Sequence, residues 1–162
     1  MKSFILLFLS LYMVYSQPAH RLEEYNFSLA TWKKLNPKFY QYVTGEYTID
    51  FDPVSRTTIT VKNGKVIKRH YWSKDPWERR YPVITWVEDT PETLGTHSEG
   101  FPPIDLDEVY IQCRSNILIH EPEMIQFEIK NNNIISRCGI HLTLCSDGCF
   151  EGVHIESITV FS

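Results

Sequence analysis

Residues Thr57 to Trp72 read TTITVKNGKVIKRHYW, and this stretch decides the fold more than any other part of the chain. In its first arm, Ile59 and Val61 alternate with threonines, which is the period of two that is typical of a half-buried strand. Asn63-Gly64 follows where a two-residue turn is needed, and a type I′ turn requires positive φ at both central residues. The second arm is again rich in strand formers. The stretch therefore predicts a β-hairpin.

Length and composition indicate an ordinary globular domain. The 162 residues are 43% hydrophobic and 14% aromatic, which is enough for a core and atypical of a disordered chain. The formal net charge of −4 leaves no basic footprint for nucleic acid. We therefore expect one domain and no nucleic-acid partner.

The N-terminus predicts secretion. A lysine precedes the apolar run from Phe4 to Tyr12, and Val14 and Ser16 are small enough for the −3 and −1 positions of a signal-peptidase site. The alternative is an uncleaved anchor, but a membrane span needs about 20 apolar residues. We expect a signal peptide at 1–16 and a secreted domain at 17–162 with no stable membrane insertion.

Two segments have the periodicity of amphipathic helices. The first covers 20–36 and ends at Asn36-Pro37, because the residue before a proline avoids the α region. The second begins at Asp105, which fits an N-cap with Glu108 at the N3 position. Their apolar stripes are Leu22, Tyr25, Leu29 and Trp32 in the first helix and Leu106, Val109, Tyr110, Cys113 and Ile117 in the second.

The remaining segments favour strands. Strand formers dominate 38–51, 124–130, 134–144 and 153–161, in addition to the hairpin. The segment 73–103 holds five of the nine prolines and is expected to be a long loop, with a short edge strand at 83–87. The order predicts an α+β fold, with an antiparallel sheet of about six strands in two meanders and two amphipathic helices packed on one face.

The four cysteines are Cys113, Cys138, Cys145 and Cys149, and in a secreted chain they predict two disulfides. We expect Cys145 to pair with Cys149 across a short turn, and Cys113 with Cys138 between the second helix and a strand. If Cys138 faces away from the helices, it would pair with Cys149 instead, leaving Cys113 for Cys145.

Two chemical alternatives for the cysteines are weaker. The series His141, Cys145, Cys149 and His154 offers ligands that suit zinc, but its spacing matches no zinc knuckle and the compartment oxidises thiols. A cysteine nucleophile with a histidine lacks any signature around it. We therefore predict no catalytic residue, no metal ligand and no cofactor.

Two further sites are hypotheses. Asn26-Phe27-Ser28 is a glycosylation sequon. Aromatic and basic side chains also gather in the segment 72–86, a composition typical of contact surfaces that predicts a binding surface. Its residues are Trp72, Trp77, Arg79, Arg80, Tyr81 and Trp86.

The order of several motifs resembles a family of small secreted or lipoprotein-type domains of unknown function. The motifs are Trp32, Tyr40-Gln-Tyr42, Thr60-Val-Lys-Asn-Gly-Lys-Val66 and Ile104-Asp-Leu-Asp-Glu-Val109. The chain departs from the family in the segment 73–103, in the cysteine-bearing final hairpin, and at Ile129 to Ser136, which replaces a glycine-tyrosine-proline turn. The resemblance implies the fold and a secreted lifestyle, and it brings no catalytic residue.

We expect a secreted, non-catalytic extracellular protein with a structural or matrix role, whose partner is an extracellular protein or matrix component. One alternative is a secreted inhibitor or ligand-binding module that uses the segment 72–86. The other is a small secreted hydrolase, which a cluster of ionisable groups in a pocket would favour.

Overall fold

The fold is taken from a computed structural model that describes residues 20–47, 53–74, 82–121, 123–130, 132–141 and 150–161. An N-terminal helix occupies residues 20–35. The other elements are β1 (Phe39–Tyr47), β2 (Pro53–Lys62), β3 (Lys65–Lys74), β4 (Pro82–Glu88), α2 (Leu106–Gln112), the π-helical turn η1 (Cys113–Ile117), β5 (Ile125–Ile129), β6 (Ile135–His141) and β7 (Phe150–Val160).

The strands of the described residues form one seven-stranded antiparallel sheet in the order β4-β3-β2-β1-β7-β6-β5. The predicted α+β fold with about six strands in two meanders and two packed amphipathic helices is wrong, because strands hold 47% and helices only 24% of the residues that the structure describes. Pairing of β1 with β7, for example Tyr42 with Ile158, joins the two expected meanders into a single sheet. The architecture is therefore closer to an all-β fold.

The hairpin of β2 and β3 is confirmed. Asn63 and Gly64 form its turn with φ of 52° and 71°, the positive values that a type I′ turn needs. The ladder then shifts, since Val61 pairs with Val66 but Thr60 pairs with Lys68. Ile67 is thus an extra residue, and this β-bulge exchanges the two faces of β3 beyond it.

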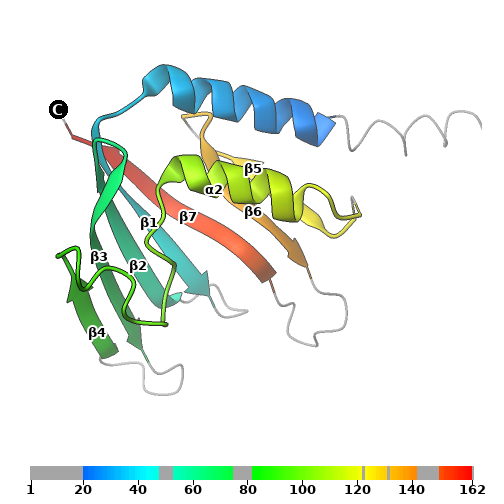
Figure 1. Ribbon diagram of the computed structural model, residues 1–162. Helices are drawn as coiled ribbons and strands as arrows, with labels where there is room; N and C mark the ends of the chain where they lie inside the picture. Colours follow the sequence, from blue (N-terminus) through cyan, green and yellow to red (C-terminus); the bar gives the residue numbers. More distant parts are fainter. Residues whose placement is uncertain are drawn as a thin grey trace, which may run out of the picture.

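The hydrophobic core lies between one face of the sheet and the helices. Figure 1 shows the N-terminal helix and α2 on the same side of the sheet. Tyr25 and Trp32 from the N-terminal helix and Leu106 from α2 pack with Tyr42 of β1 and Ile59 of β2. Asp105 begins α2 as expected, because its carboxylate accepts a hydrogen bond from the Glu108 amide at 2.8 Å.

A row of directly paired residues on this face shows where the core changes character. The row runs Ile158, Tyr42, Ile59, Arg69 and Glu88 across β7, β1, β2, β3 and β4. It is apolar beneath the helices and ionic at β3 and β4. The charged end of the row is covered by the chain segment 95–101, which follows β4.

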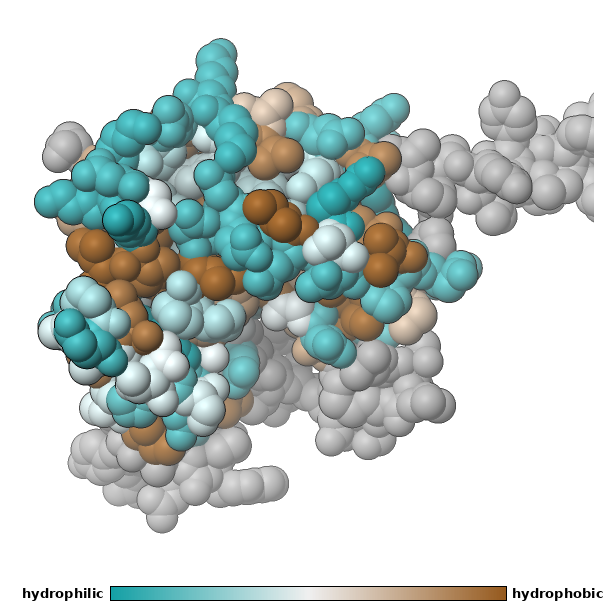
Figure 2. Space-filling view, in the orientation of Figure 1, coloured by the Kyte–Doolittle hydropathy of each residue, from teal (hydrophilic) through white to brown (hydrophobic). Residues whose placement is uncertain are grey.

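The β4 strand lies within the proline-rich segment 73–103, where a short edge strand was predicted, and it is an edge of the sheet. Within the described residues, none of the helices combines the length and apolar character that crossing a bilayer requires. Seen from the helix side, the surface is mostly hydrophilic and its hydrophobic residues form separate patches (Figure 2).

Candidate functional site

A cavity of about 380 Å³ opens between the sheet, the α2–η1 helix and the segment 100–102. Its floor is formed by β1, β2, β6 and β7, and its apolar walls include Phe101, Val109, Ile117 and Val153. This volume falls in the range of roughly 300–1,000 Å³ that small-molecule sites occupy. It is therefore the best candidate for a functional site in the described part of the chain.

Three buried hydroxyl groups line the floor. Thr44, Ser55 and Thr57 are 5%, 4% and 2% exposed. Ser55 donates a hydrogen bond to the Glu46 carboxylate at 2.9 Å, and the Thr57 hydroxyl accepts one from the Phe101 amide at 2.9 Å. Thr44 donates to the Thr57 carbonyl oxygen at 3.5 Å, a long contact. The floor is thus polar although its residues are shielded from bulk water.

Arg69 holds the wall at 100–102 in place. Its guanidinium, on a side chain that is 1% exposed, donates to the carbonyl oxygens of Phe101 at 2.8 Å and His97 at 3.0 Å, and also to that of Glu99. These bonds tie the segment 97–101 to β3. A guanidinium suits this role because its donors have a fixed planar geometry and it remains charged when buried.

Glu88 completes this clamp from β4. Its carboxylate, on a side chain that is 0% exposed, accepts hydrogen bonds from the amides of Gly95 and His97, each at 2.8 Å, and from Arg69 at 3.2 Å. The His97 ring lies 2.9 Å away through Nδ1. Burial by itself raises the pKa of Glu88, but the hydrogen bonds from Gly95, His97 and Arg69 outweigh it and lower the pKa to about 2.

Aromatic rings pack around the clamp. Trp86 stacks on the ring of His97 at 4.3 Å and on that of Tyr71 at 5.2 Å, and the Arg69 guanidinium lies 4.5 Å from its centre. The Trp86 Nε1 atom is buried without a hydrogen-bond partner among the described residues. Gly100 lies against this stack with φ of 73°, and an added Cβ would come within 2.6 Å of Tyr71. The wall therefore needs glycine there.

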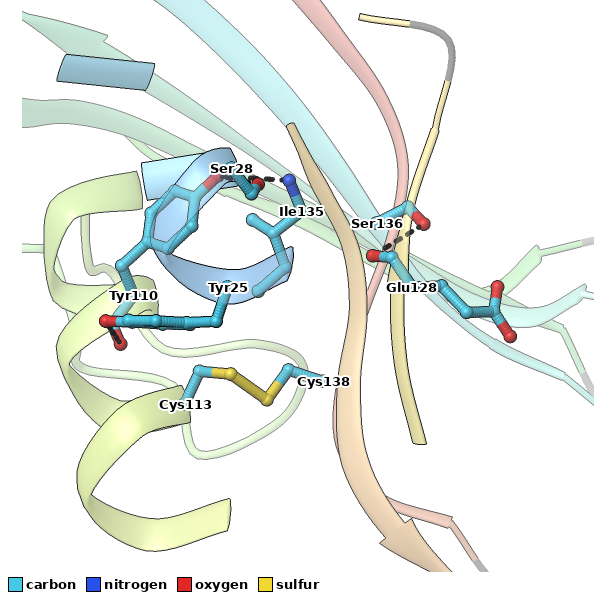
Figure 3. Close-up of a disulfide and its surroundings, with 8 residues drawn as sticks. All are labelled: Tyr25, Ser28, Tyr110, Cys113, Glu128, Ile135, Ser136 and Cys138. Carbon is cyan, nitrogen blue, oxygen red and sulfur yellow. Dashed lines mark hydrogen bonds between the residues drawn. A yellow bond between two sulfur atoms is a disulfide. The ribbon is translucent and has the colours of Figure 1, made fainter. Parts of the chain in front are cut away.

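The opposite wall is fixed by the disulfide between Cys113 and Cys138, whose Cα atoms are 5.9 Å apart. It joins the beginning of η1 to β6 (Figure 3). This predicted pair is confirmed, and Cys138 faces the helices. The predicted partner pair, Cys145 and Cys149, lies outside the described residues.

A buried polar network lies beside the disulfide. The Tyr110 hydroxyl accepts a hydrogen bond from the Ile135 amide at 3.0 Å and shares one with Ser28 at 2.7 Å, while Tyr25 donates to the Tyr110 carbonyl oxygen at 2.9 Å (Figure 3). Burial raises the pKa of Tyr110, which keeps the phenol protonated. The network therefore connects the N-terminal helix, α2 and β6.

The predicted binding surface at 72–86 is divided between the two faces of the sheet. Tyr71 pairs with Trp86 and Trp72 pairs with Thr85, so Trp86 faces the helices while Trp72 faces the opposite side. Trp72 there lies 5.5 Å from the Arg56 guanidinium. The described residues therefore do not bring Trp72 and Trp86 together, and Trp77, Arg79, Arg80 and Tyr81 lie outside them.

Asn26 is exposed on the N-terminal helix, as a glycosylation acceptor must be, whereas Ser28 of the same sequon is fully buried. The zinc alternative finds little support in the positions of its histidines. His141 pairs with Phe150 and His154 with Arg137, so the two histidines are displaced by four residues along β6, or roughly 13 Å. No group of three metal-ligating side chains is found among the described residues.

The sequence does not predict the cavity or its clamp. Arg69 stands inside the strand-forming hairpin, and Glu88 directly follows the edge strand predicted at 83–87. Strict alternation in a bulge-free hairpin places Arg69 on the outer face. One signal was available. Arg69 and Tyr71 are two residues apart and therefore lie on the same face of the strand, so a buried Tyr71 implies a buried Arg69.

Comparison with known proteins adds no relative. No family model, no curated protein and no solved structure matches this chain.

Proposed function

We propose that the protein is a secreted, non-catalytic binding protein that holds a small organic molecule in the cavity between the sheet and α2. The observation that carries the proposal is the cavity of about 380 Å³ with buried hydroxyl groups on its floor and apolar side chains on its walls. Ligand sites typically combine such apolar walls with a few convergent polar groups. Secretion is part of the proposal because the sequence predicts a signal peptide at 1–16.

The way in which the cavity is framed supports a preformed site. The Arg69–Glu88 clamp holds one wall, and the Cys113–Cys138 disulfide holds another. Both anchors are buried, and the residues they join are 19 and 25 positions apart in the sequence, respectively. A rigid site loses little conformational entropy when a ligand binds, so binding energy is retained for the ligand itself.

The hydrogen-bond partners of the floor hydroxyls favour a binding function over hydrolysis. A nucleophilic hydroxyl needs a base that takes its proton and a free path to the substrate. Two of the three floor hydroxyls lack such a base, because the Thr57 hydroxyl accepts a backbone amide from the wall and the Thr44 hydroxyl donates to a carbonyl oxygen. The Ser55 hydroxyl does donate to a carboxylate, that of Glu46, but no further hydrogen bond orients this carboxylate among the described residues. These hydroxyls therefore hold the cavity together.

A structural or matrix role is the second candidate function. It draws on the predicted secretion and disulfides, and its partner would be an extracellular protein or matrix component. Recovery of the native protein mainly from an insoluble extracellular fraction, with no small molecule bound, supports this role over ligand binding.

The test uses a matched pair of variants at the mouth of the cavity. Asn116 and Ser115 are both exposed, and Ser115 donates a hydrogen bond to Asn116 at 2.8 Å, so replacing either residue breaks the same bond. Only Asn116 lines the cavity. Asn116→Trp should therefore obstruct the mouth, while Ser115→Trp provides the control.

We would titrate 1-hexanol and follow the methyl NMR signals of Val109, Ile117 and Val153. We expect saturable shifts in the wild type and in Ser115→Trp, and at least a tenfold loss of affinity in Asn116→Trp. Unchanged hexanol binding in Asn116→Trp, or no saturable shift in the wild type, would contradict the proposal.

A further inference from the structure

The mouth of the cavity carries two carboxylates on the helix-facing side of the sheet. Thr44 pairs with Ile155 across β1 and β7, and both face the helices. Glu46 lies two residues beyond Thr44, and Glu151 lies four residues before Ile155 on the antiparallel strand. Because side chains alternate along a strand, both carboxylates point to the same face at the same end of the sheet.

No positive side chain balances these carboxylates within the cavity. The described lining contains neither lysine nor arginine. His154 also lines the cavity, but burial and the nearby charges of Arg137 and Lys130 lower its pKa, which favours its neutral form. Glu46 accepts one hydrogen bond, from Ser55, and Glu151 has no hydrogen bond or ion pair within the described residues. The potential at the mouth is therefore negative.

The floor supplies an independent indication of a ligand. Thr44 is 5% exposed and lines the cavity, yet its hydroxyl has one hydrogen bond among the described residues, donated at 3.5 Å. This bond uses the hydroxyl proton and leaves the oxygen lone pairs without a donor among the described residues. Its lone pairs are therefore available to a donor placed in the cavity.

We infer that the ligand of this cavity carries a protonated amine, held by the carboxylates of Glu46 and Glu151 with the Thr44 hydroxyl as a further acceptor. The apolar part of the ligand would lie along Val109 and Ile117. This inference rests on the proposed binding function. An ammonium group has donors and no acceptor, which complements a site made of acceptors.

An organic cation fits the cavity better than a metal ion. Calcium takes six to eight oxygen ligands, and the described lining offers two carboxylates at the mouth rather than a closed set. Much of the remaining wall is apolar. Such a wall complements a hydrocarbon body and contributes nothing to a bare ion.

The experiment compares n-hexylamine with 1-hexanol, which share a hydrocarbon chain and differ in charge at pH 7. Both are titrated into the full mature chain at low salt, with NMR detection. We expect hexylammonium to bind roughly tenfold more tightly than hexanol, and the difference to shrink at high ionic strength. In Glu46→Gln/Glu151→Gln, the two probes should bind with affinities within about twofold of each other. Thr44→Val should weaken hexylammonium more than hexanol.

The control variant, Glu92→Gln/Glu123→Gln, removes the same net charge from exposed positions outside the cavity and should keep the preference for hexylammonium. Equal affinities of the two probes in the wild type would overturn the inference and leave the binding proposal intact. A preference that survives Glu46→Gln/Glu151→Gln would also overturn it. Failure of both probes to bind the wild type would overturn the binding proposal as well.

Discussion

Replacing Glu88 by glutamine should strongly destabilise the protein. The glutamate is fully buried and its two oxygens accept hydrogen bonds from Gly95, Arg69 and His97. Glutamine keeps one acceptor oxygen and presents an amide donor in place of the other. Either orientation therefore sets a donor against donors and leaves the Arg69 charge without its partner.

The magnitude follows from two routes. A carboxyl whose pKa falls from 4.5 to about 2 on folding contributes about 3 kcal/mol to stability at neutral pH. Removing one member of a buried ion pair costs about 3–5 kcal/mol, since the other charge stays buried. We therefore expect Glu88→Gln to lower the free energy of unfolding by about 3–5 kcal/mol.

The assay is urea unfolding at pH 7, combined with hydrogen exchange at the Gly95 and His97 amides. The variant should lose both stability and the protection of these amides, because Glu88 accepts their hydrogen bonds. Glu92→Gln, at an exposed position in the same segment, is the control and should change stability by less than about 0.5 kcal/mol. A loss below about 1 kcal/mol in Glu88→Gln would refute the reasoning.

The same residue sets a pH dependence. Its folded-state pKa lies below the unfolded value of 4.5, so its contribution is complete above that value and is lost as the pH falls through about 2. Between about pH 5 and pH 2, the wild type should therefore lose about 3 kcal/mol more than Glu88→Gln does. Parallel profiles for the two proteins would show that Glu88 is not the group responsible.

Three further predictions concern other parts of the chain. Gly64→Val should cost about 1–3 kcal/mol in urea unfolding, because a β-branched residue must adopt the positive φ of the turn, and an unchanged midpoint would contradict this. Cys113→Ser/Cys138→Ser should cost about 3–4 kcal/mol by the same assay, as expected for a sequence separation of 25, and a loss under 1 kcal/mol would count against the chain-entropy estimate. Asn26→Gln should abolish any glycan mass shift with little loss of stability. Ser28→Ala should also abolish the shift, but it should lower the free energy of unfolding by about 1–2 kcal/mol because the buried hydroxyl bonds Tyr110. Equal stability of the two variants would argue against a structural role of this hydroxyl.

Features with a local cause could be predicted from the sequence. The turn at Asn63-Gly64 depends on two adjacent residues that tolerate positive φ, and the cap at Asp105 depends on a side chain that reaches an amide three residues on. The Cys113–Cys138 disulfide followed from the stripe of a helix and the compartment. For the turn and the cap, a few neighbouring residues carry enough information, whereas the disulfide also required Cys138 to face the helices.

Features with a long-range cause could not be predicted in this way. Pairing of β1 with β7 brings Tyr40 beside Val160 and turns two meanders into one sheet, and nothing in either strand specifies the other. The cavity depends on the same event, since its lining comes from β1, β2, α2, η1, β6, β7 and the segment 100–102. Its residues share a site only after the sheet has closed.

The bulge at Ile67 shows most directly how one residue limits what a pattern can predict. Without it, the two-residue turn would pair Ile59 with Lys68 and direct Trp72 toward the helices. With it, Ile59 pairs with Arg69, and Arg69 and Tyr71 face the core instead. A lysine in that row would present a single ammonium group, which cannot span three carbonyl oxygens and a carboxylate as the planar guanidinium does. The wall of the cavity therefore depends on the pairing of Ile59 with Arg69. Deleting Ile67 removes the extra residue and keeps that pairing, because Lys68 then follows Val66 opposite Thr60 in a regular ladder. Amide protection at Gly95 and His97 and the Asn63-Gly64 turn should therefore be retained, and loss of protection at those amides would contradict this reasoning.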